Sequence, residues 1–198
     1  MPLGRKKSNP YRIAILGILT AIILIQNFVP FLGNIPIPPL NPTIIHVTVI
    51  VATLVLGTKD GMIVGGVWGI TRMIRAYTVP ATPLDWWLWT NPLIALLPRI
   101  MIGLLTGLTY KLIKHYFPSK EKISMSIASV IGSFTNTIMV LFFIYLFYGE
   151  RYAQAIDVDL SNLAGVLFVI VGTSGVAEAV LAGIVAPLIA TPLKKIKH

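Results

Sequence analysis

Long apolar stretches separated by short polar segments dominate the pattern of residues along this chain. Six apolar blocks can be traced, at about residues 11–32, 42–56, 61–76, 91–112, 124–148 and 162–193. A helix needs about 20 mostly apolar residues to cross a bilayer, with a usual range of about 17–25. The first, fourth, fifth and sixth blocks meet this requirement, so the pattern predicts a helical membrane protein.

The second and third blocks, 42–56 and 61–76, are short for a bilayer span. We still expect both to cross, because the chain must alternate sides and GTKDG (57–61) is typical of a tight polar turn. A re-entrant helical pair is the alternative. The predicted fold class is an all-α membrane protein, a compact bundle of six transmembrane helices that forms one domain over residues 1–198.

The composition agrees with a membrane protein. Hydrophobic residues make up 56% of the chain and charged residues only 12%, against about 25% charged residues in an ordinary soluble domain. The formal net charge of +9 would suggest nucleic acid in a soluble protein, but in a membrane protein the position of the charges matters more than their sum. We therefore expect no nucleic-acid partner. The absence of cysteine excludes disulfides and thiolate metal sites.

Lysine and arginine are distributed very unevenly between the polar segments. Twelve of the 16 lie on the side of the N-terminus, three lie within apolar blocks, and only Arg151 lies in the opposite loops. This asymmetry predicts that both termini are cytoplasmic. The first block follows RKK as a signal peptide would, but it is too long and lacks a small-residue cleavage site. We interpret it as the first spanning helix.

Small residues recur at helical spacing in four of the blocks. In a bilayer, helices pack closely where such residues share a face. In the third, fourth and sixth blocks we expect them to pack the bundle internally; they are Gly61, Gly65, Gly69, Gly103, Gly107, Gly175, Ala179 and Gly183. In the first block, Ala14, Gly17 and Ala21 share one face. That face is the better candidate for contact with an external partner.

Several polar or aromatic residues interrupt the apolar blocks, and they are the candidate binding residues. The set is His46, Trp68, Arg72, Arg75, Asn91, Arg99, Asn136 and Glu178. A charge near the bilayer centre costs about 2.5–3.5 kcal/mol on insertion scales, so it normally faces a cavity or a partner. Arg99, Asn136 and Glu178 fall at similar depth in three consecutive blocks. We therefore expect a water-accessible pocket that opens to the outside.

The charge of this pocket indicates an anionic ligand. Three arginines stand against one acidic residue, Glu178, and the planar guanidinium fork suits a carboxylate. Simpler interpretations stay open: Arg75 reaches the outer headgroups, Arg99 and Glu178 form a purely structural ion pair, and His46 is a packing residue. The residues alone indicate a small, water-soluble, carboxylate-bearing solute.

Two polar segments on the expected outer side are distinctive. Residues 35–41, IPIPPLN, contain three prolines, which predict a stiff, extended segment. Trp86, Trp87 and Trp89 lie close together in the next outer segment. These tryptophans suit either an aromatic belt at the membrane interface or a cover over a ligand.

No sequence motif indicates catalysis or a cofactor. There is no Walker A sequence, HExxH, GxSxG or Cys/His cluster. A membrane enzyme that uses Glu178 and His46 is the weakest hypothesis, because no nucleophile–base or metal spacing supports it. Secondary transporters usually consist of two related halves, so six helices without an internal repeat argue against an autonomous secondary transporter.

Several features together resemble a known family. They are the basic N-terminus, the small-residue first helix, the proline-rich outer segment, the stretch TIIHVTVIVATLVLG-(x)3-G (43–61) and PRI (98–100). The chain is similar to the S component of energy-coupling factor (ECF) vitamin transporters, and most similar to the pantothenate-specific type. The resemblance covers about residues 11–193.

The resemblance implies a substrate-binding subunit of an importer in the prokaryotic plasma membrane. Such a subunit captures a vitamin from outside and works with a membrane T component and two cytoplasmic ATPases. The family's docking motif, Ala-xxx-Ala on the first helix, corresponds here to Gly17-xxx-Ala21, so Ala14, Gly17 and Ala21 are the expected contact. The resemblance also implies a lid made by residues 35–41 and 86–89.

The vitamin is less firmly indicated than the family. Pantothenate carries a carboxylate, in agreement with the surplus of arginines. The alternatives are an S component for folate, biotin or a hydroxymethylpyrimidine or pyridoxine precursor, and a membrane assembly subunit that binds no solute.

Overall fold

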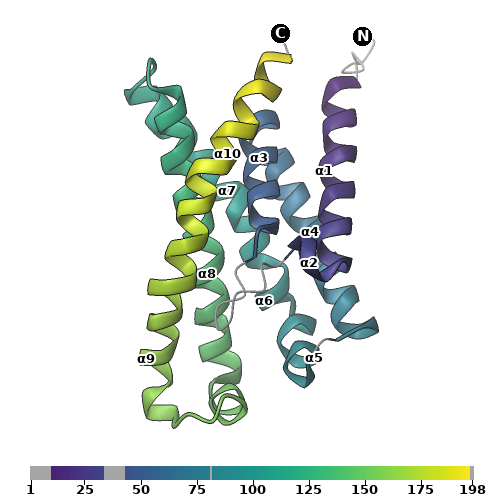
Figure 1. Ribbon diagram of the computed structural model, residues 1–198, viewed down its shortest axis with the longest axis vertical. Helices are drawn as coiled ribbons and strands as arrows, with labels where there is room; N and C mark the ends of the chain where they lie inside the picture. The colour runs from purple at the N-terminus through teal and green to yellow at the C-terminus, as the bar shows by residue number, and fades with distance from the viewer. Residues whose placement is uncertain (1–9, 34–42, 81, 197–198) are drawn as a thin grey trace, which may run out of the picture.

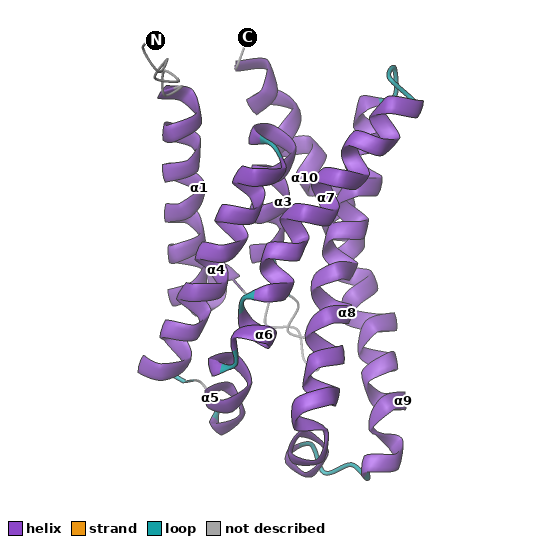
Figure 2. Ribbon diagram, turned by 180° about the vertical axis from the view of Figure 1, so that it is seen from behind, coloured by secondary structure: helices purple, strands orange, loops and turns teal. Residues whose placement is uncertain are grey.

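The structure, a computed structural model, describes residues 10–33, 43–80 and 82–196. Within these ranges it is almost entirely helical and contains no strand (Figures 1 and 2). Four helices are long and apolar enough to cross a membrane: Pro10–Phe28, Pro92–Tyr116, Glu121–Ala155 and Leu160–Ile196. These observations confirm the prediction of an all-α membrane protein.

Ten α-helices and one π-helical turn make up the described ranges. They are α1 (Pro10–Phe28), α2 (Pro30–Gly33), α3 (Ile45–Leu56), α4 (Thr58–Thr78), α5 (Pro83–Thr90), α6 (Pro92–Ala95), α7 (Leu97–Tyr116), α8 (Glu121–Ala155), α9 (Leu160–Ile170), η1 (Val171–Gly175) and α10 (Val176–Ile196). The longer helices run roughly along the long axis (Figure 1). The short α3 contacts α1, α4, α7, α8 and α10 and is buried over Ile45–Val55, so it forms the centre of the core.

The connection between the second and third apolar blocks differs from the expected polar turn. Only Gly57 breaks the helix, with a φ of 113° that favours glycine, and Thr58–Gly61 already form the first turn of α4. A turn over 57–61 was therefore a wrong prediction. Asp60 suits this position because an acidic group is favourable at a helix N-terminus. It also accepts two hydrogen bonds from Arg12 of α1, at 2.6 and 2.8 Å.

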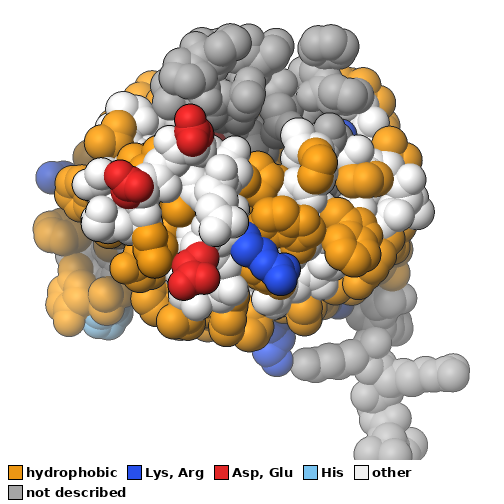
Figure 3. Space-filling model, turned by 90° about the horizontal axis from the view of Figure 1, so that it is seen from below, with side chains coloured by type: hydrophobic (Ala, Val, Ile, Leu, Met, Phe, Trp, Pro, Cys, Tyr) orange, Lys and Arg blue, Asp and Glu red, His pale blue; other side chains and the backbone are white. Residues whose placement is uncertain are grey.

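Two expected loops are helical instead. The fifth apolar block ends at Tyr148, where φ is −135° and ψ is 18°, but α8 continues beyond this kink to Ala155. The tryptophan-rich segment forms α5, which begins with a Thr82 cap that accepts from the Asp85 N–H and with Pro83 in its first turn. Figure 3 shows the end face of the molecule on the side of the α8–α9 turn and of α5, where acidic side chains lie among polar and apolar ones.

The glycines of α4 and α7 allow these two helices to touch along their backbones. A Cβ atom added at Gly65 would lie 2.1 Å from the Arg99 carbonyl oxygen, and one at Gly103 would lie 2.5 Å from the Gly61 carbonyl carbon. Gly69 approaches the backbone of Leu96 in the same way. The spacing of small residues thus predicted the packing of these blocks correctly, and Gly65 fixes the depth at which Arg99 is held.

A methyl group at Gly65 tests this packing. Gly65→Ala is expected to lower the Tm in detergent by about 3–10 °C, because overpacking costs about 1–3 kcal/mol in a chain of this size. The control is the adjacent Gly66→Ala, where the nearest atom to an added Cβ is 3.8 Å away, an ordinary contact. Equal Tm values for the two variants would contradict the packing described here.

Candidate functional site

Two adjoining cavities inside the bundle collect most of the predicted site residues. One has a volume of about 220 Å³ and the other about 180 Å³, and Thr43, Trp89 and Arg99 line both. The first also contains Trp68, Arg72 and Arg75, and the second Asn136 and Glu178. Six of the eight predicted residues therefore surround one connected site, which we call the polar cavity.

Arg99 forms the junction between the two halves of the polar cavity. Its side chain is 4% exposed, and its Nη1 donates to the Ile94 carbonyl oxygen at 2.5 Å. In an uninterrupted helix that carbonyl would accept from residue 98, but Pro98 has no N–H to give. The proline beside Arg99 thus leaves free the acceptor that the buried guanidinium uses, and the chain breaks between α6 and α7 at this point.

Two indole rings complete the surroundings of Arg99. Its guanidinium lies 4.9 Å from the ring centroid of Trp68 and 4.8 Å from that of Trp89. Trp89 also receives the guanidinium of Arg72, at 4.7 Å from the centroid. Each such contact contributes about 0.5–2 kcal/mol, so Trp89 of α5 holds two cations on one side of the polar cavity.

Asp85 changes the charge balance that the sequence suggested. Arg72 Nη2 lies 3.4 Å from Asp85 Oδ1, and Trp89 Nε1 donates to the same oxygen at 2.9 Å. Arg75 instead donates to the backbone carbonyl of Asn27 on α1. Asp85 belongs to a segment expected to be an outer loop, and the folding of α5 brings it to Arg72.

Glu178 faces the second half of the polar cavity and makes no ion pair with Arg99 or any other described residue. Its two carboxylate oxygens accept from the Thr43 N–H at 2.8 Å and the Thr137 hydroxyl at 3.1 Å. The π-helical turn directly before α10 sets its position, and such turns often occur at functional sites. The structural Arg99–Glu178 ion pair is therefore not formed.

Several buried polar atoms in the polar cavity have no hydrogen-bond partner among the described residues. They are Asn27 Oδ1 and Nδ2, Trp68 Nε1, Arg99 Nε and Asn136 Oδ1. Unpaired buried polar atoms are rare, and each costs about 1–3 kcal/mol. Asn27 is only 1% exposed, yet its place near the end of the first apolar block gave no sign of this role. The polar cavity therefore presents both hydrogen-bond donors and acceptors that no described residue uses.

The remaining predicted residues lie elsewhere. His46 is fully buried and its Nε2 lies 3.2 Å from the Ser133 hydroxyl, so it contacts α8 and lines neither half of the polar cavity. Asn91 caps α6 by accepting from the Leu93 N–H at 3.0 Å. Ala14, Gly17 and Ala21 are exposed on α1. The expected lid segment, residues 35–41, lies outside the described residues.

The three tryptophans of α5 have different surroundings. Trp89 lines both halves of the polar cavity, whereas Trp86 is exposed. Trp87 contacts the ring of Tyr148 at 6.3 Å between centroids. The belt interpretation therefore suits Trp86, and the interpretation as a ligand cover suits Trp89.

Comparison with known proteins identifies the family. The family model described as "ECF transporter, substrate-specific component" matches residues 11–190. The chain belongs to this family. It is an S component of an ECF transporter, a transport protein rather than an enzyme.

Relatives and a solved structure agree with this assignment. The S component is 31% identical to the pantothenic acid transporter PanT of Lactococcus lactis over 98% of both chains. It is 28% identical to the pantothenate transporter PanT of Leuconostoc mesenteroides, over 83% of this chain and 82% of that one. A crystal structure of the S component for biotin from an ECF-type ABC transporter has a TM-score of 0.57 at 17% identity, covering 93% and 94% of the chains. That likeness shows a shared fold.

The unpaired amide of Asn27 leads to a stability prediction. Replacing it by the similarly sized apolar residue in Asn27→Leu is expected to leave the free energy of unfolding of the ligand-free protein unchanged or higher, because the buried unsatisfied atoms are removed. Ile23→Ala, at a fully buried position one turn earlier, should instead cost about 2–5 kcal/mol. Thermal unfolding compares the two variants. A loss in Asn27→Leu as large as that in Ile23→Ala would show that Asn27 is a structural residue.

Proposed function

We propose that this S component binds pantothenate in the polar cavity and releases it inward together with a T component and two ATPases. The observation that best supports this proposal is the polar cavity itself. Arg99 and Glu178 line the same cavity without forming an ion pair, and several buried polar atoms have no hydrogen-bond partner among the described residues. The names of two relatives, matched over most of the chain, support the choice of vitamin.

The chemistry of pantothenate suits the two halves of the polar cavity. The molecule has a carboxylate at one end, an amide in the middle and two hydroxyls at the other end. Arg99, with Arg72 and Arg75, suits the carboxylate, since charge-assisted bonds to guanidinium are strong. Glu178 and Asn136 suit the hydroxyls, and Asn27 offers both a donor and an acceptor. Each half is smaller than the roughly 300–1,000 Å³ of a typical ligand pocket, so a small vitamin would extend through both.

The arrangement in the membrane is part of the proposal. Residues 1–198 form one multi-pass domain with six membrane-crossing helical units, made by α1, α3, α4, α6–α7, α8 and α9–α10. Both termini are cytoplasmic in the prokaryotic plasma membrane, as the lysine and arginine asymmetry indicates. The polar cavity then opens toward the outside, and α5 covers it there.

Titration with pantothenate and with pantothenol, the uncharged alcohol in which CH2OH replaces the carboxylate, tests the proposed role of Arg99. The wild-type S component is expected to bind pantothenate much more tightly than pantothenol in calorimetry. Arg99→Lys and Arg99→Ala should lower pantothenate affinity by roughly 10–100-fold. This range corresponds to the free energy that a hydrogen bond to a charged group contributes. Affinity for pantothenol should change far less.

Two controls accompany this titration. Arg151→Gln removes a cation that lies outside the polar cavity and contacts Trp87, and it should leave both affinities unchanged. Folate and biotin test the alternative vitamins. Pantothenate affinity retained in a folded Arg99→Ala protein would contradict the assignment of Arg99, and tight binding of another vitamin would correct the substrate.

We also propose that the exposed face of α1 around Ala14, Gly17 and Ala21 contacts the T component. A Cβ at Gly17 would meet no atom within 4 Å, so this face takes no part in packing the bundle. Gly17→Leu is expected to preserve vitamin affinity and Tm but to abolish co-purification with the T component and ATPases. The matched control is Gly165→Leu on α9, which is equally open. Intact complex formation by Gly17→Leu would move the docking face elsewhere.

A further inference from the structure

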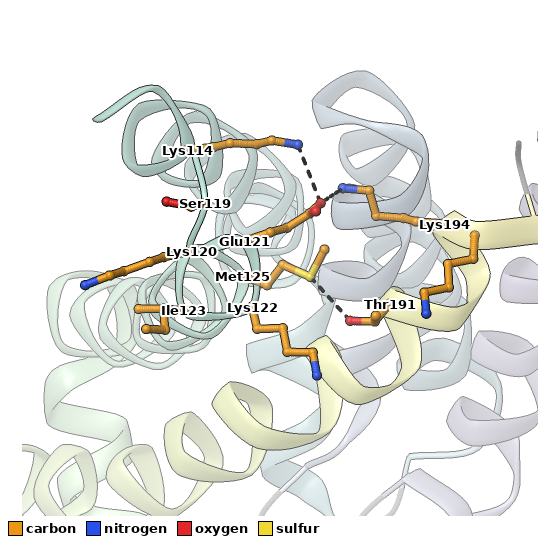
Figure 4. A pocket seen from close by; sticks show the side chains of 10 residues that line it. Lys114, Ser119, Lys120, Glu121, Lys122, Ile123, Met125, Thr191 and Lys194 are labelled. Carbon is orange, nitrogen blue, oxygen red and sulfur yellow. Dashed lines mark hydrogen bonds and ion pairs between the residues drawn. The ribbon is translucent and has the colours of Figure 1, made fainter. Parts of the chain in front are cut away.

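A second, larger cavity lies where α7 meets α8 and where α10 ends, and it shares no lining residue with the polar cavity (Figure 4). Figure 1 shows that these helix ends lie together at one end of the bundle. Its volume is about 670 Å³, and its lining includes five lysines and one acidic residue, Glu121. The lysines are Lys114, Lys120, Lys122, Lys194 and Lys195. Five positive charges against one negative charge leave a surplus of four. Nothing in the vitamin site uses this basic cavity.

The walls of the basic cavity are fixed by interactions between three helices. Glu121 of α8 accepts a hydrogen bond from Lys194 of α10 at 2.6 Å and another from the hydroxyl of Tyr110 of α7 at 2.8 Å. Lys114 lies 3.5 Å from the same carboxylate. Figure 4 shows Lys114 and Lys194 converging on Glu121 from opposite sides. Glu121 therefore joins the helices and neutralises charge on these two lysines.

The other three lysines are available for an anion. Lys120, Lys122 and Lys195 form no ion pair with a described residue, and all three are exposed at the rim of the basic cavity. Three cations without a paired carboxylate leave the rim positively charged, and a positive surface attracts an anion. The charge at this rim thus favours a ligand with a phosphate or a comparable anionic group.

An apolar surface leads away from the same rim. Ile123 lines the basic cavity, and Ile127 and Ile131 continue from it on one exposed face of α8 at four-residue spacing. On α10, Thr191 lines the cavity, and Leu188 and Ile184 extend the same face as exposed apolar residues. A soluble anion would make no use of these surfaces, but an acyl chain attached to the anion would.

We propose that the basic cavity is a binding site for an anionic phospholipid. The phosphate of the headgroup lies at the rim beside Lys122 of α8 and Lys195 of α10, and an acyl chain follows the exposed face of α8 formed by Ile123, Ile127 and Ile131. Basic pockets between membrane helices bind anionic headgroups through this combination of charge and apolar contact. The proposal is independent of the vitamin that the protein binds.

Native mass spectrometry of the purified S component with added lipid tests this site. Phosphatidylglycerol is expected to be retained in preference to phosphatidylcholine. The double variant Lys122→Gln/Lys195→Gln should lower that preference about tenfold or more, since each lysine near the surface contributes roughly fivefold to the attraction. The matched control is Lys59→Gln/Lys111→Gln, which removes two exposed lysines from the same end but outside the basic cavity.

Each alternative outcome overturns the proposal in a recognisable way. An equal loss of preference in both double variants would show general surface attraction instead of a site. Displacement of phosphatidylglycerol by inorganic phosphate at millimolar concentration would show a pocket for a soluble anion. No preference for phosphatidylglycerol in the wild-type protein would reject anionic recognition altogether. Equal Tm values of the wild-type protein and both double variants check that the variants are folded, and this control does not depend on the vitamin proposal.

Discussion

The structure around the polar cavity depends on how one buried guanidinium is held. Arg99 costs about 2.5–3.5 kcal/mol to place near a bilayer centre, and no carboxylate among the described residues pairs with it. Pro98 leaves the Ile94 carbonyl free for it, and two indole faces enclose it. Gly65 lets α4 approach the Arg99 backbone closely enough to fix its position. The packing glycine, the helix break and the two tryptophans together hold the Arg99 guanidinium in place.

The same arrangement keeps the two charged groups at the junction and in the second half of the polar cavity without an ion pair between them. Arg99 and Glu178 are kept apart by separate sets of partners, so neither neutralises the other. The amides of Asn27 and Asn136 add polar atoms that have no hydrogen-bond partner among the described residues. A ligand that satisfies these groups would stabilise the folded protein on binding.

Much of this arrangement could be predicted from the sequence, because membrane helices leave a strong hydropathy signal and polar residues within them stand out. Six of the eight predicted residues line the polar cavity, namely Trp68, Arg72, Arg75, Arg99, Asn136 and Glu178. The role of Asn27 could not be predicted, since an asparagine near a helix end is common at the membrane surface. Its burial depends on α4, whose Arg75 binds the Asn27 carbonyl.

Other features needed the folded chain for similar reasons. Asp85 appeared to lie in a polar loop, and only the capping of α5 by Thr82 turns it toward Arg72. The GTKDG segment contains typical turn residues, yet the Asp60–Arg12 pair and a single glycine are enough to begin α4 at once. The position of His46 in an apolar block allows either a pocket residue or a packing residue, and only the folded chain shows that it contacts Ser133. The hydropathy pattern indicates how deep a residue lies in the membrane, but whether its side chain faces the polar cavity depends on how the helices around it pack.

A structure of the S component with bound pantothenate would test the central claim most directly. The account predicts ligand density within the polar cavity, with the carboxylate against Arg99 and its neighbouring arginines and the hydroxyl end toward Glu178 and Asn136. Density in the reverse orientation, or in another cavity while Arg99 keeps its present contacts, would contradict the account.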